Sequence, residues 1–250
     1  MDGVGLCVQA LNPKPQNFIY ALHGFLGQSA DWGNVFKTLE QDCHIVCPSY
    51  FSDEIFSDLK LDHFIQDIEK QSKNHFIAKK IFVGYSLGGR IGLRLLEARP
   101  DLFDHSVFIS THSGLSNEVE KKARVQSDQK WIETLQTSSW EDFLIKWNRQ
   151  DVLKKSIAAE RLEAFYNKNR LVAALLDYSL GKQEDYSALI KAHQDRITWV
   201  IGDQDTKFLN LADDLKQKKI LLDYKRILSG HRILFDNPLG LSNILDIISK

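Results

Sequence analysis

One pentapeptide constrains the fold of this chain more than any other feature of its sequence. The segment Gly84–Gly88 reads Gly-Tyr-Ser-Leu-Gly; it follows the apolar run Ile81–Val83 and opens a helical pattern that continues to Arg99. A strand that passes directly into a helix needs a turn so tight that a Cβ atom would clash, and the flanking glycines lack one. Such a turn raises the Ser86 hydroxyl above a sheet and places helical N–H groups beside it. The pattern therefore predicts a reactive serine at the carboxyl end of a buried strand.

The rest of the chain supports a parallel sheet. Short apolar runs predict buried strands at Phe18–Leu22, His44–Cys47, Lys80–Gly84, Ser106–Ser110, Ile197–Gly202 and Ile220–Leu228. Helical patterns lie between the early ones, at Ser29–Gln41, Asp58–Asn74 and Leu87–Arg99. This alternation predicts the α/β class, with a mostly parallel sheet that carries helices on both faces.

The alternation stops in the middle of the chain, where only helical patterns occur. They lie at Val119–Leu135, Trp140–Arg149, Ser156–Asn167, Leu171–Leu180 and Tyr186–Lys191. The block follows the carboxyl end of a strand, where open α/β sheets carry their sites. We therefore expect residues 116–193 to form a helical cap, or lid, inserted into a core made of residues 1–115 and 194–250. The alternative is that these helices are peripheral packing.

Composition limits the function. The 250 residues carry 32 Lys+Arg against 33 Asp+Glu, a balance that gives no reason to expect nucleic acid as a partner. No apolar run reaches the roughly 18–20 residues of a membrane span, and the first residues show no signal-peptide pattern. Cys7, Cys43 and Cys47 fit reduced thiols better than disulfides, and no second Cys/His pair completes a zinc site. We expect a cytoplasmic protein that acts on a small molecule without a metal or cofactor.

A reactive serine needs a base, and the base needs an acid to orient it. The predicted strand Ile220–Leu228 is followed by Gly230-His231, the one histidine of the eight that sits in a turn after a strand. Two carboxylates, Asp203 and Asp205, follow the strand at Ile197–Gly202. We expect Asp205 to be the acid because it lies deeper in the loop, and Asp203 to brace the turn.

Two further features belong to the same site. The loop His23–Gly27 follows an early strand, so the N–H groups of Phe25 and Leu87 could together form an oxyanion hole; the His23 side chain then braces the loop. Arg90 lies one helical turn after Ser86, where a cation opposes the helix dipole. Its spacing fits equally a structural salt bridge and a guanidinium that holds a substrate carboxylate.

At these positions the chain resembles the SHCHC (2-succinyl-6-hydroxy-2,4-cyclohexadiene-1-carboxylate) synthases of menaquinone biosynthesis. The similar segments cover most of the chain: His23-Gly24-Phe25 with Asp31-Trp32, Gly84–Arg90, Arg124–Trp131, Trp147, Gly202–Phe208, and Gly230-His231 with Asn237-Pro238. The Gly-Tyr-Ser-Leu-Gly-Gly-Arg string and the Arg and Trp of the cap are more specific than the pentapeptide alone.

The resemblance implies an α/β-hydrolase fold that carries a lyase. The family eliminates pyruvate from SEPHCHC, the 5-enolpyruvyl precursor (2-succinyl-5-enolpyruvyl-6-hydroxy-3-cyclohexene-1-carboxylate). Carried over to this chain, Ser86, Asp205 and His231 form the triad. The remaining roles implied are oxyanion donors at Phe25 and Leu87, carboxylate binding by Arg90 and Arg124, and a pocket lined by Tyr85 and Trp147.

The chain departs from the family pattern in two places. Pro48-Ser49-Tyr50-Phe51-Ser52 replaces the usual Pro-Gly-His-Gly-x-Ser after the strand at His44–Cys47. The family's third cap arginine aligns with Ala164–Phe165, and Arg161, Lys168 or Arg170 could substitute for it by a shift of about one turn.

Two other function classes remain open from the sequence. One is a carboxylesterase or thioesterase that forms an acyl-Ser86 intermediate with the same triad. A pocket for neutral esters would gain little from the pair Arg90 and Arg124, which argues against it. The other is a non-catalytic binding protein of the same fold, which would have lost triad residues that this chain retains.

Overall fold

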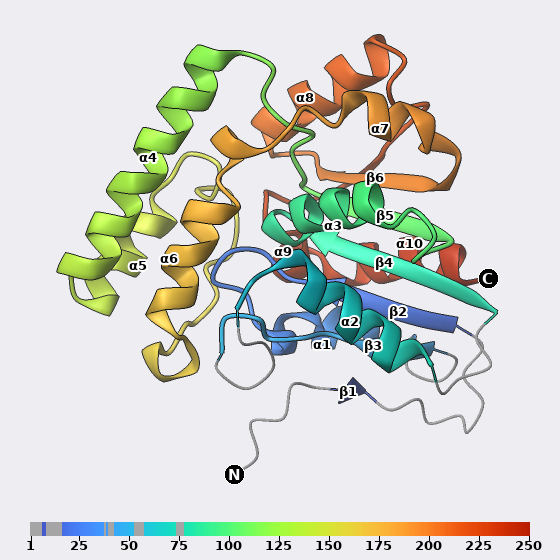
Figure 1. The fold of residues 1–250 in the computed structure, drawn as a ribbon, viewed down its shortest axis with the longest axis horizontal. Helices are drawn as coiled ribbons and strands as arrows, with labels where there is room; N and C mark the ends of the chain where they lie inside the picture. Colours follow the sequence, from blue (N-terminus) through green and yellow to red (C-terminus); the bar gives the residue numbers. More distant parts are fainter. Residues whose placement is uncertain (1–6, 9–16, 38, 40–42, 53–57, 74–77) are drawn as a thin grey trace.

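The computed structural model describes residues 7–8, 17–37, 39, 43–52, 58–73 and 78–250. Within these ranges, seven strands form one sheet in the order β1-β3-β2-β4-β5-β6-β7 (Figure 1). The strands are β1 (Cys7–Val8), β2 (Asn17–Leu22), β3 (Cys43–Val46), β4 (Lys79–Tyr85), β5 (His105–Ile109), β6 (Ile197–Gly202) and β7 (Lys225–Ile227). Strand β1 is antiparallel to β3, and all the other pairs are parallel. The prediction of a mostly parallel α/β sheet is confirmed.

Both faces of the sheet are covered, because alternate side chains of each strand enter different hydrophobic clusters. In β2, Phe18 and Tyr20 pack on one face, and Ile19 and Ala21 pack on the other; all four are fully buried. Helices α2 (Leu61–Ser72), α3 (Leu87–Ala98) and α8 (Thr206–Gln217) cover the first face. Helices α1 (Gly33–Phe36), α9 (Ile233–Asp236) and α10 (Pro238–Ser249) cover the second.

No strand lies in the described chain between β5 and β6, and its regular elements are all helical. They are α4 (Glu118–Thr137), α5 (Trp140–Asn148), α6 (Lys168–Asp177) and α7 (Ser187–Ala192), with the 3₁₀ turns η2 (Glu163–Phe165), η3 (Leu180–Lys182) and η4 (Gln194–Arg196). Helices α4, α5 and α6 stand to one side of the sheet, at the left of Figure 1. We retain residues 116–193 as the proposed boundaries of this cap.

Two predicted elements are wrong in extent. The expected helix at Ser156–Asn167 is an irregular segment that contains only the short η2 turn. Its polar groups bond to other parts of the protein: the Ile157 N–H donates to Asp236 at 2.7 Å, and the Arg161 carbonyl accepts from Trp140 at 2.7 Å. Those partners replace the bonds of a helix, so tertiary contacts override the local pattern.

The strand expected at Ile220–Leu228 is shorter than predicted, since β7 covers only Lys225–Ile227. Lys219 has φ 57°, and the next two N–H groups, those of Ile220 and Leu221, both donate to the Leu215 carbonyl. Ile220 and Leu221, the apolar start of the predicted strand, therefore cap the C-terminus of α8 and do not extend β7. The sequence patterns also did not predict β1, α8, α9 or α10.

The helices predicted before Ser86 differ less. The pattern at Ser29–Gln41 becomes the 3₁₀ turn η1 (Ser29–Trp32) followed by α1, and residues 38 and 40–41 lie outside the described ranges. The pattern at Asp58–Asn74 becomes α2, with residue 74 also outside them. No helix within the described ranges has both the length and the apolar character that crossing a membrane requires.

Candidate active site

Ser86 lies in the tight turn that the sequence predicts, between β4 and α3. Its backbone has φ 52° and ψ −107°, a region that a non-glycine residue occupies only when its surroundings hold it there. The Ser86 N–H donates to the Ile109 carbonyl at 2.8 Å. A Cβ atom at Gly88 would lie 2.1 Å from the Leu22 carbonyl oxygen, so only glycine allows α3 to approach β2 this closely.

The loops after β6 and β7 bring a histidine and a carboxylate to this serine. His231 Nδ1 lies 2.6 Å from Asp205 Oδ2, and His231 Nε2 lies 3.2 Å from Ser86 Oγ. His231 is 5% exposed and Asp205 4% exposed, so both groups are largely shielded from water. Asp203 Oδ1 instead accepts from the Ser229 N–H at 3.2 Å. Of the two acids, Asp205 contacts the histidine and Asp203 braces the turn before it.

A cavity of about 180 Å³ opens above Ser86, between the sheet and the cap. Its described lining comes from the core loops, from the start of α3 and from helices α4, α5, α6 and α8. The lining residues are Gly24, Phe25, Tyr85, Ser86, Leu87, Arg90, Arg124, Asp128, Trp147, Gln150, Val152, Leu153, Ala174, Leu175, Tyr178, Lys207, Phe208, His231 and Arg232. Every residue that the sequence assigned to the site lines this cavity except Asp205, which lies behind His231.

The charged lining of the cavity is mainly cationic. Four cations line it, and the one carboxylate among the described lining residues, Asp128, is already bonded. Asp128 accepts from Arg124 Nε at 2.9 Å and from the Ser179 hydroxyl at 2.7 Å. Arg90 donates to the Tyr178 carbonyl, and no described carboxylate lies within ion-pair distance of it. Its position one turn after Ser86 is therefore not explained by a salt bridge within the described chain.

Mutual repulsion and loss of hydration both act on two of these cations, Arg90 and Lys207. Burial first, and the charge of Arg124 second, lower the pKa of Arg90 to about 9. Loss of hydration and the same arginine also lower the pKa of Lys207, although this residue remains exposed to solvent. Positive charges held together at this cost would be stabilised by an anion in the cavity.

Sequence reasoning missed two of the four cations, Lys207 and Arg232. Lys207 lies in the first turn of α8, two residues after Asp205, and Arg232 directly follows His231. Arg232 donates to the Asn148 side chain and to the Ile157 carbonyl. Proximity in sequence to the triad residues was the signal that could have identified both.

The three candidates for the third cap arginine lie elsewhere. Arg161 pairs with Asp31, and Lys168 pairs with Glu163. Arg170 lines a different cavity, between α2 and α6. None of the three belongs to the described lining of the cavity above Ser86, so none of them replaces the third cap arginine there.

The loop after β2 is braced as predicted. The His23 ring is fully buried and stacks on Tyr50 at a centroid distance of 4.0 Å, and His23 Nδ1 lies 2.9 Å from the Gly24 carbonyl. Tyr50 belongs to the segment that replaces the family's Pro-Gly-His-Gly-x-Ser, and its hydroxyl donates to the His23 carbonyl. Trp147 packs on Phe25 at 4.6 Å, joining α5 of the cap to this loop.

Comparison with known proteins agrees with the fold described above. The family model described as "alpha/beta hydrolase fold" matches residues 17–238. The 2-succinyl-6-hydroxy-2,4-cyclohexadiene-1-carboxylate synthase of Enterobacter sp. (strain 638) is 29% identical over 231 residues, covering 90% of this chain and 88% of that protein. The synthase of the same name from Citrobacter koseri is 28% identical over 252 residues, covering 96% and 97%.

Among solved structures, the structure of MenH from S. aureus superposes with a TM-score of 0.81 at 19% identity and covers 95% of this chain and 94% of that one. At that identity the superposition speaks for the fold, which is the one deduced above. The chain therefore belongs to the α/β-hydrolase fold family, and within that family it resembles the 2-succinyl-6-hydroxy-2,4-cyclohexadiene-1-carboxylate synthases.

Proposed function

We propose that this protein is a lyase that eliminates pyruvate from SEPHCHC and releases SHCHC. The observation that carries the proposal is the combination, in one cavity, of a serine–histidine–aspartate relay with four cationic side chains. The relay supplies a base. The cations suit a substrate with three carboxylates, and the names of the relatives point to the same reaction.

In the proposed reaction Ser86 is the base that removes the proton α to the succinyl ketone, and His231 takes the proton from Ser86. Asp205 holds Nδ1 of His231, fixes its tautomer and stabilises the imidazolium. The electron pair of the broken C–H bond forms an enolate, whose oxygen the N–H groups of Phe25 and Leu87 would stabilise. As the enolate collapses into the ring diene, the C–O bond breaks and its electron pair stays on the oxygen that leaves. The enolpyruvate anion takes up the proton that His231 accepted and tautomerises to pyruvate, which restores the neutral histidine.

Arg90 and Arg124 are the proposed carboxylate ligands, and Tyr85 and Trp147 line the same cavity. A bidentate guanidinium holds a carboxylate in a fixed plane, which orients the α-proton toward Ser86. An ester hydrolase for neutral substrates would have no use for this charge, so the cavity favours the lyase over the carboxylesterase or thioesterase alternative.

The direct test is incubation with SEPHCHC while pyruvate release and diene absorbance are followed. The wild-type protein should produce both signals in equal amounts. Ser86→Ala and His231→Ala should each lower kcat/KM by about three decades or more, and the double variant should be little worse, because the two residues act as a unit. Near wild-type turnover by Ser86→Ala would refute the proposed role of the serine.

A second measurement separates elimination from acyl transfer. A base mechanism has no covalent intermediate, so pyruvate should appear without a burst, and the Ser86 peptide should carry no mass adduct in quenched turnover. Deuterium at the α-carbon should slow turnover if proton removal limits the rate. An acyl-Ser86 species trapped from SEPHCHC would instead establish the esterase or thioesterase reading.

A further inference from the structure

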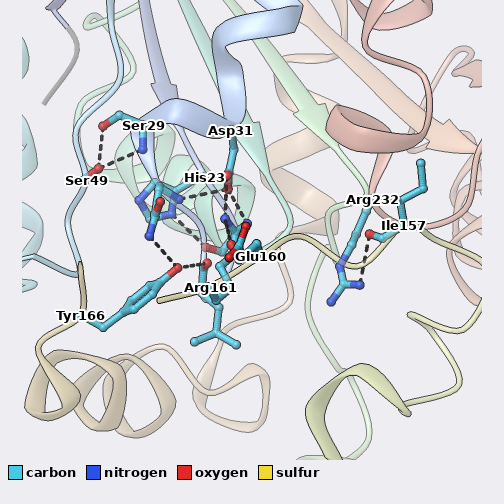
Figure 2. Close-up of polar contacts among 12 residues, drawn as sticks. His23, Ser29, Asp31, Ser49, Ile157, Glu160, Arg161, Tyr166 and Arg232 are labelled. Atoms are coloured by element: carbon cyan, nitrogen blue, oxygen red, sulfur yellow. Dashed lines mark hydrogen bonds and ion pairs between the residues drawn. The ribbon is translucent and has the colours of Figure 1, made fainter. Parts of the chain in front are cut away.

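The segment of the cap that fails to form a helix contacts the loops on both sides of the triad. We call residues 156–166 the cap connector. At its start, Ser156 Oγ accepts from the Arg232 N–H at 2.9 Å, and the Ile157 N–H donates to Asp236 at 2.7 Å. Further along, Arg161 and Tyr166 reach the opposite loop, which follows β2 and carries Phe25 (Figure 2). The connector therefore bridges the His231 loop and the proposed oxyanion loop.

Arg161 makes the strongest of these contacts. Its two terminal nitrogens each lie 2.8 Å from a different oxygen of Asp31, in the paired geometry that a guanidinium and a carboxylate favour. The side chains of Arg161 and Asp31 are only 11% and 7% exposed, so water screens the pair weakly. The same carboxylate accepts from the Gln28 N–H at 3.0 Å, which ties the end of the loop to the pair.

Tyr166 holds the middle of the loop. Its hydroxyl donates to the Leu26 carbonyl at 2.8 Å and accepts from the Gln28 side chain at 3.0 Å. Leu26 has φ 59°, a left-handed conformation that costs free energy for a residue with a Cβ atom. A bond to its own carbonyl from the cap helps to hold this residue in that conformation.

These contacts bear on the Phe25 amide because of the geometry of the turn. The Gly24 carbonyl belongs to the same peptide plane as the Phe25 N–H, and in a trans peptide the two point in opposite directions. That carbonyl accepts from the Gly27 N–H at 2.9 Å, so the turn from Gly24 to Gly27 fixes the direction of the Phe25 N–H. Tyr166 binds the second half of this turn at Leu26, and Arg161 binds Asp31 in the residues that follow it.

We propose that Arg161 and Tyr166 are positioning residues, through which the cap holds the Phe25 amide in the direction that oxyanion stabilisation requires. The inference rests on the proposed function for the role of the Phe25 amide. The cap would then do more than cover the cavity: loosening the grip of the connector would lower turnover while the cations still bind the substrate.

The first arm of the test compares kcat and KM for pyruvate release. Removal of an oxyanion donor lowers kcat by about 100-fold or more, and displacement of the donor should lower it by at most that much. Arg161→Met should therefore lower kcat by about 10- to 100-fold and change KM by less than about twofold. Arg161→Lys should recover part of the loss, since it keeps the charge and loses the paired geometry. Tyr166→Phe, which removes one oxygen atom, should lower kcat by about 3- to 10-fold.

Two matched variants control for lost bonds elsewhere in the fold. Arg196→Met removes a guanidinium that bonds the Pro100 and Phe103 carbonyls, and Tyr186→Phe removes a hydroxyl bonded to Glu97. Neither residue belongs to the described lining of the cavity. Both controls should keep kcat and KM within about twofold of the wild-type values.

The second arm measures the loop directly by amide hydrogen exchange. Peptides that cover residues 23–31 should exchange faster in Arg161→Met and Tyr166→Phe and at the wild-type rate in both controls. Unchanged exchange in this loop, unchanged kcat despite faster exchange, or a loss confined to KM would each overturn the proposal. If the wild-type protein releases no pyruvate, the proposed function fails on its own, and the exchange rates of the loop decide whether the cap holds it.

Discussion

Asp203 and Asp205 are two residues apart in one loop, but their side chains make different contacts. Asp205 is buried against His231, whereas Asp203 accepts from the backbone of Ser229. A residue's role here depends on which way the loop turns after β6. Asp205 also accepts weakly from the Phe208 N–H as the N-cap of α8, so the start of that helix helps to aim its carboxylate.

Substitution of the two acids by amides should separate their roles. Asp205→Asn should lower kcat by about two to four decades, because an amide cannot hold His231 in the required tautomer or stabilise its imidazolium. Asp203→Asn should lower it by less than about tenfold, since an amide oxygen can still accept from Ser229. Steady-state rates of both variants with SEPHCHC test this, and the reverse ranking would assign the acid to Asp203.

Lys207 should contribute to carboxylate recognition alongside the arginines. Lys207→Gln should lower kcat/KM for the tricarboxylate by about tenfold, which corresponds to about 1.4 kcal/mol for a partly hydrated ammonium. Lys218→Gln is the matched control, because Lys218 ends the same helix at the surface and pairs with Asp214. Equal losses in the two variants would mean that the effect comes from the stability of α8 and not from the cavity.

At the scale of elements, the contact between α3 and the sheet determines the position of Ser86. The helix begins immediately after the serine, and its first turn lies against the end of β2 with no space for a side chain at Gly88. The close approach also places the start of α3 next to the loop that carries Phe25, since the Cβ position of Gly88 is 2.6 Å from the His23 carbonyl oxygen as well. A shift of α3 would therefore disturb the serine and the loop together.

Two glycine substitutions in helices should have opposite effects. Gly88→Ala should destabilise the fold by about 2–3 kcal/mol through overpacking, which lowers Tm by about 4–12 °C, and should abolish turnover. Gly33→Ala should stabilise it by about 0.5–1 kcal/mol, because Gly33 has helical angles and an added Cβ meets nothing within 4 Å. Thermal unfolding of both variants is the measurement; a Gly88→Ala protein as stable and active as wild type would contradict the close packing.

At the scale of the whole molecule, two histidines that burial keeps neutral, His23 and the partly buried His112, make the stability of the protein sensitive to acid. Burial lowers the pKa of His23 to about 3, and burial together with the cavity cations lowers that of His112 to about 3. Because both folded values lie below the unfolded value of about 6.5, the unfolded chain binds more protons as the pH falls. The stability is thus fully present above about pH 6.5 and is lost as the pH falls from there toward 3.

The free energy of unfolding should therefore decrease below pH 6.5, by up to about 1.4 kcal/mol per pH unit for each of the two histidines. His112→Asn should make the decrease shallower, since the Asn oxygen can accept from Gly114 as His112 Nδ1 does and does not titrate. Urea unfolding of the wild type and this variant at several pH values between 4 and 7 tests the prediction. Parallel curves for the two proteins would show that the pKa of His112 does not differ between the folded and the unfolded chain, and would refute the prediction.

The sequence by itself determined the architecture and the reactive serine. A strand buried on both faces has to be apolar, and the turn at Ser86 needs residues without side chains at Gly84 and Gly88. Both requirements are local, so both can be recognised from the sequence alone. The choice between Asp203 and Asp205 could be argued from loop position alone. The cations Lys207 and Arg232 were missed although they lie close in sequence to Asp205 and His231, because proximity alone does not say which way a lysine or arginine side chain points.

Only the tertiary structure decided how the cap meets the core. The segment expected to be a helix at Ser156–Asn167 is irregular, because Asp236, Trp140 and Asp31 supply its backbone and side chains with partners that lie far away in the sequence. Because of these contacts, the Arg161 side chain binds Asp31 after β2 and does not line the cavity above Ser86. A local sequence pattern indicates which secondary structure a segment favours in isolation. Hydrogen bonds to distant parts of the fold can stabilise another conformation by more than this preference, once their partners are held in place.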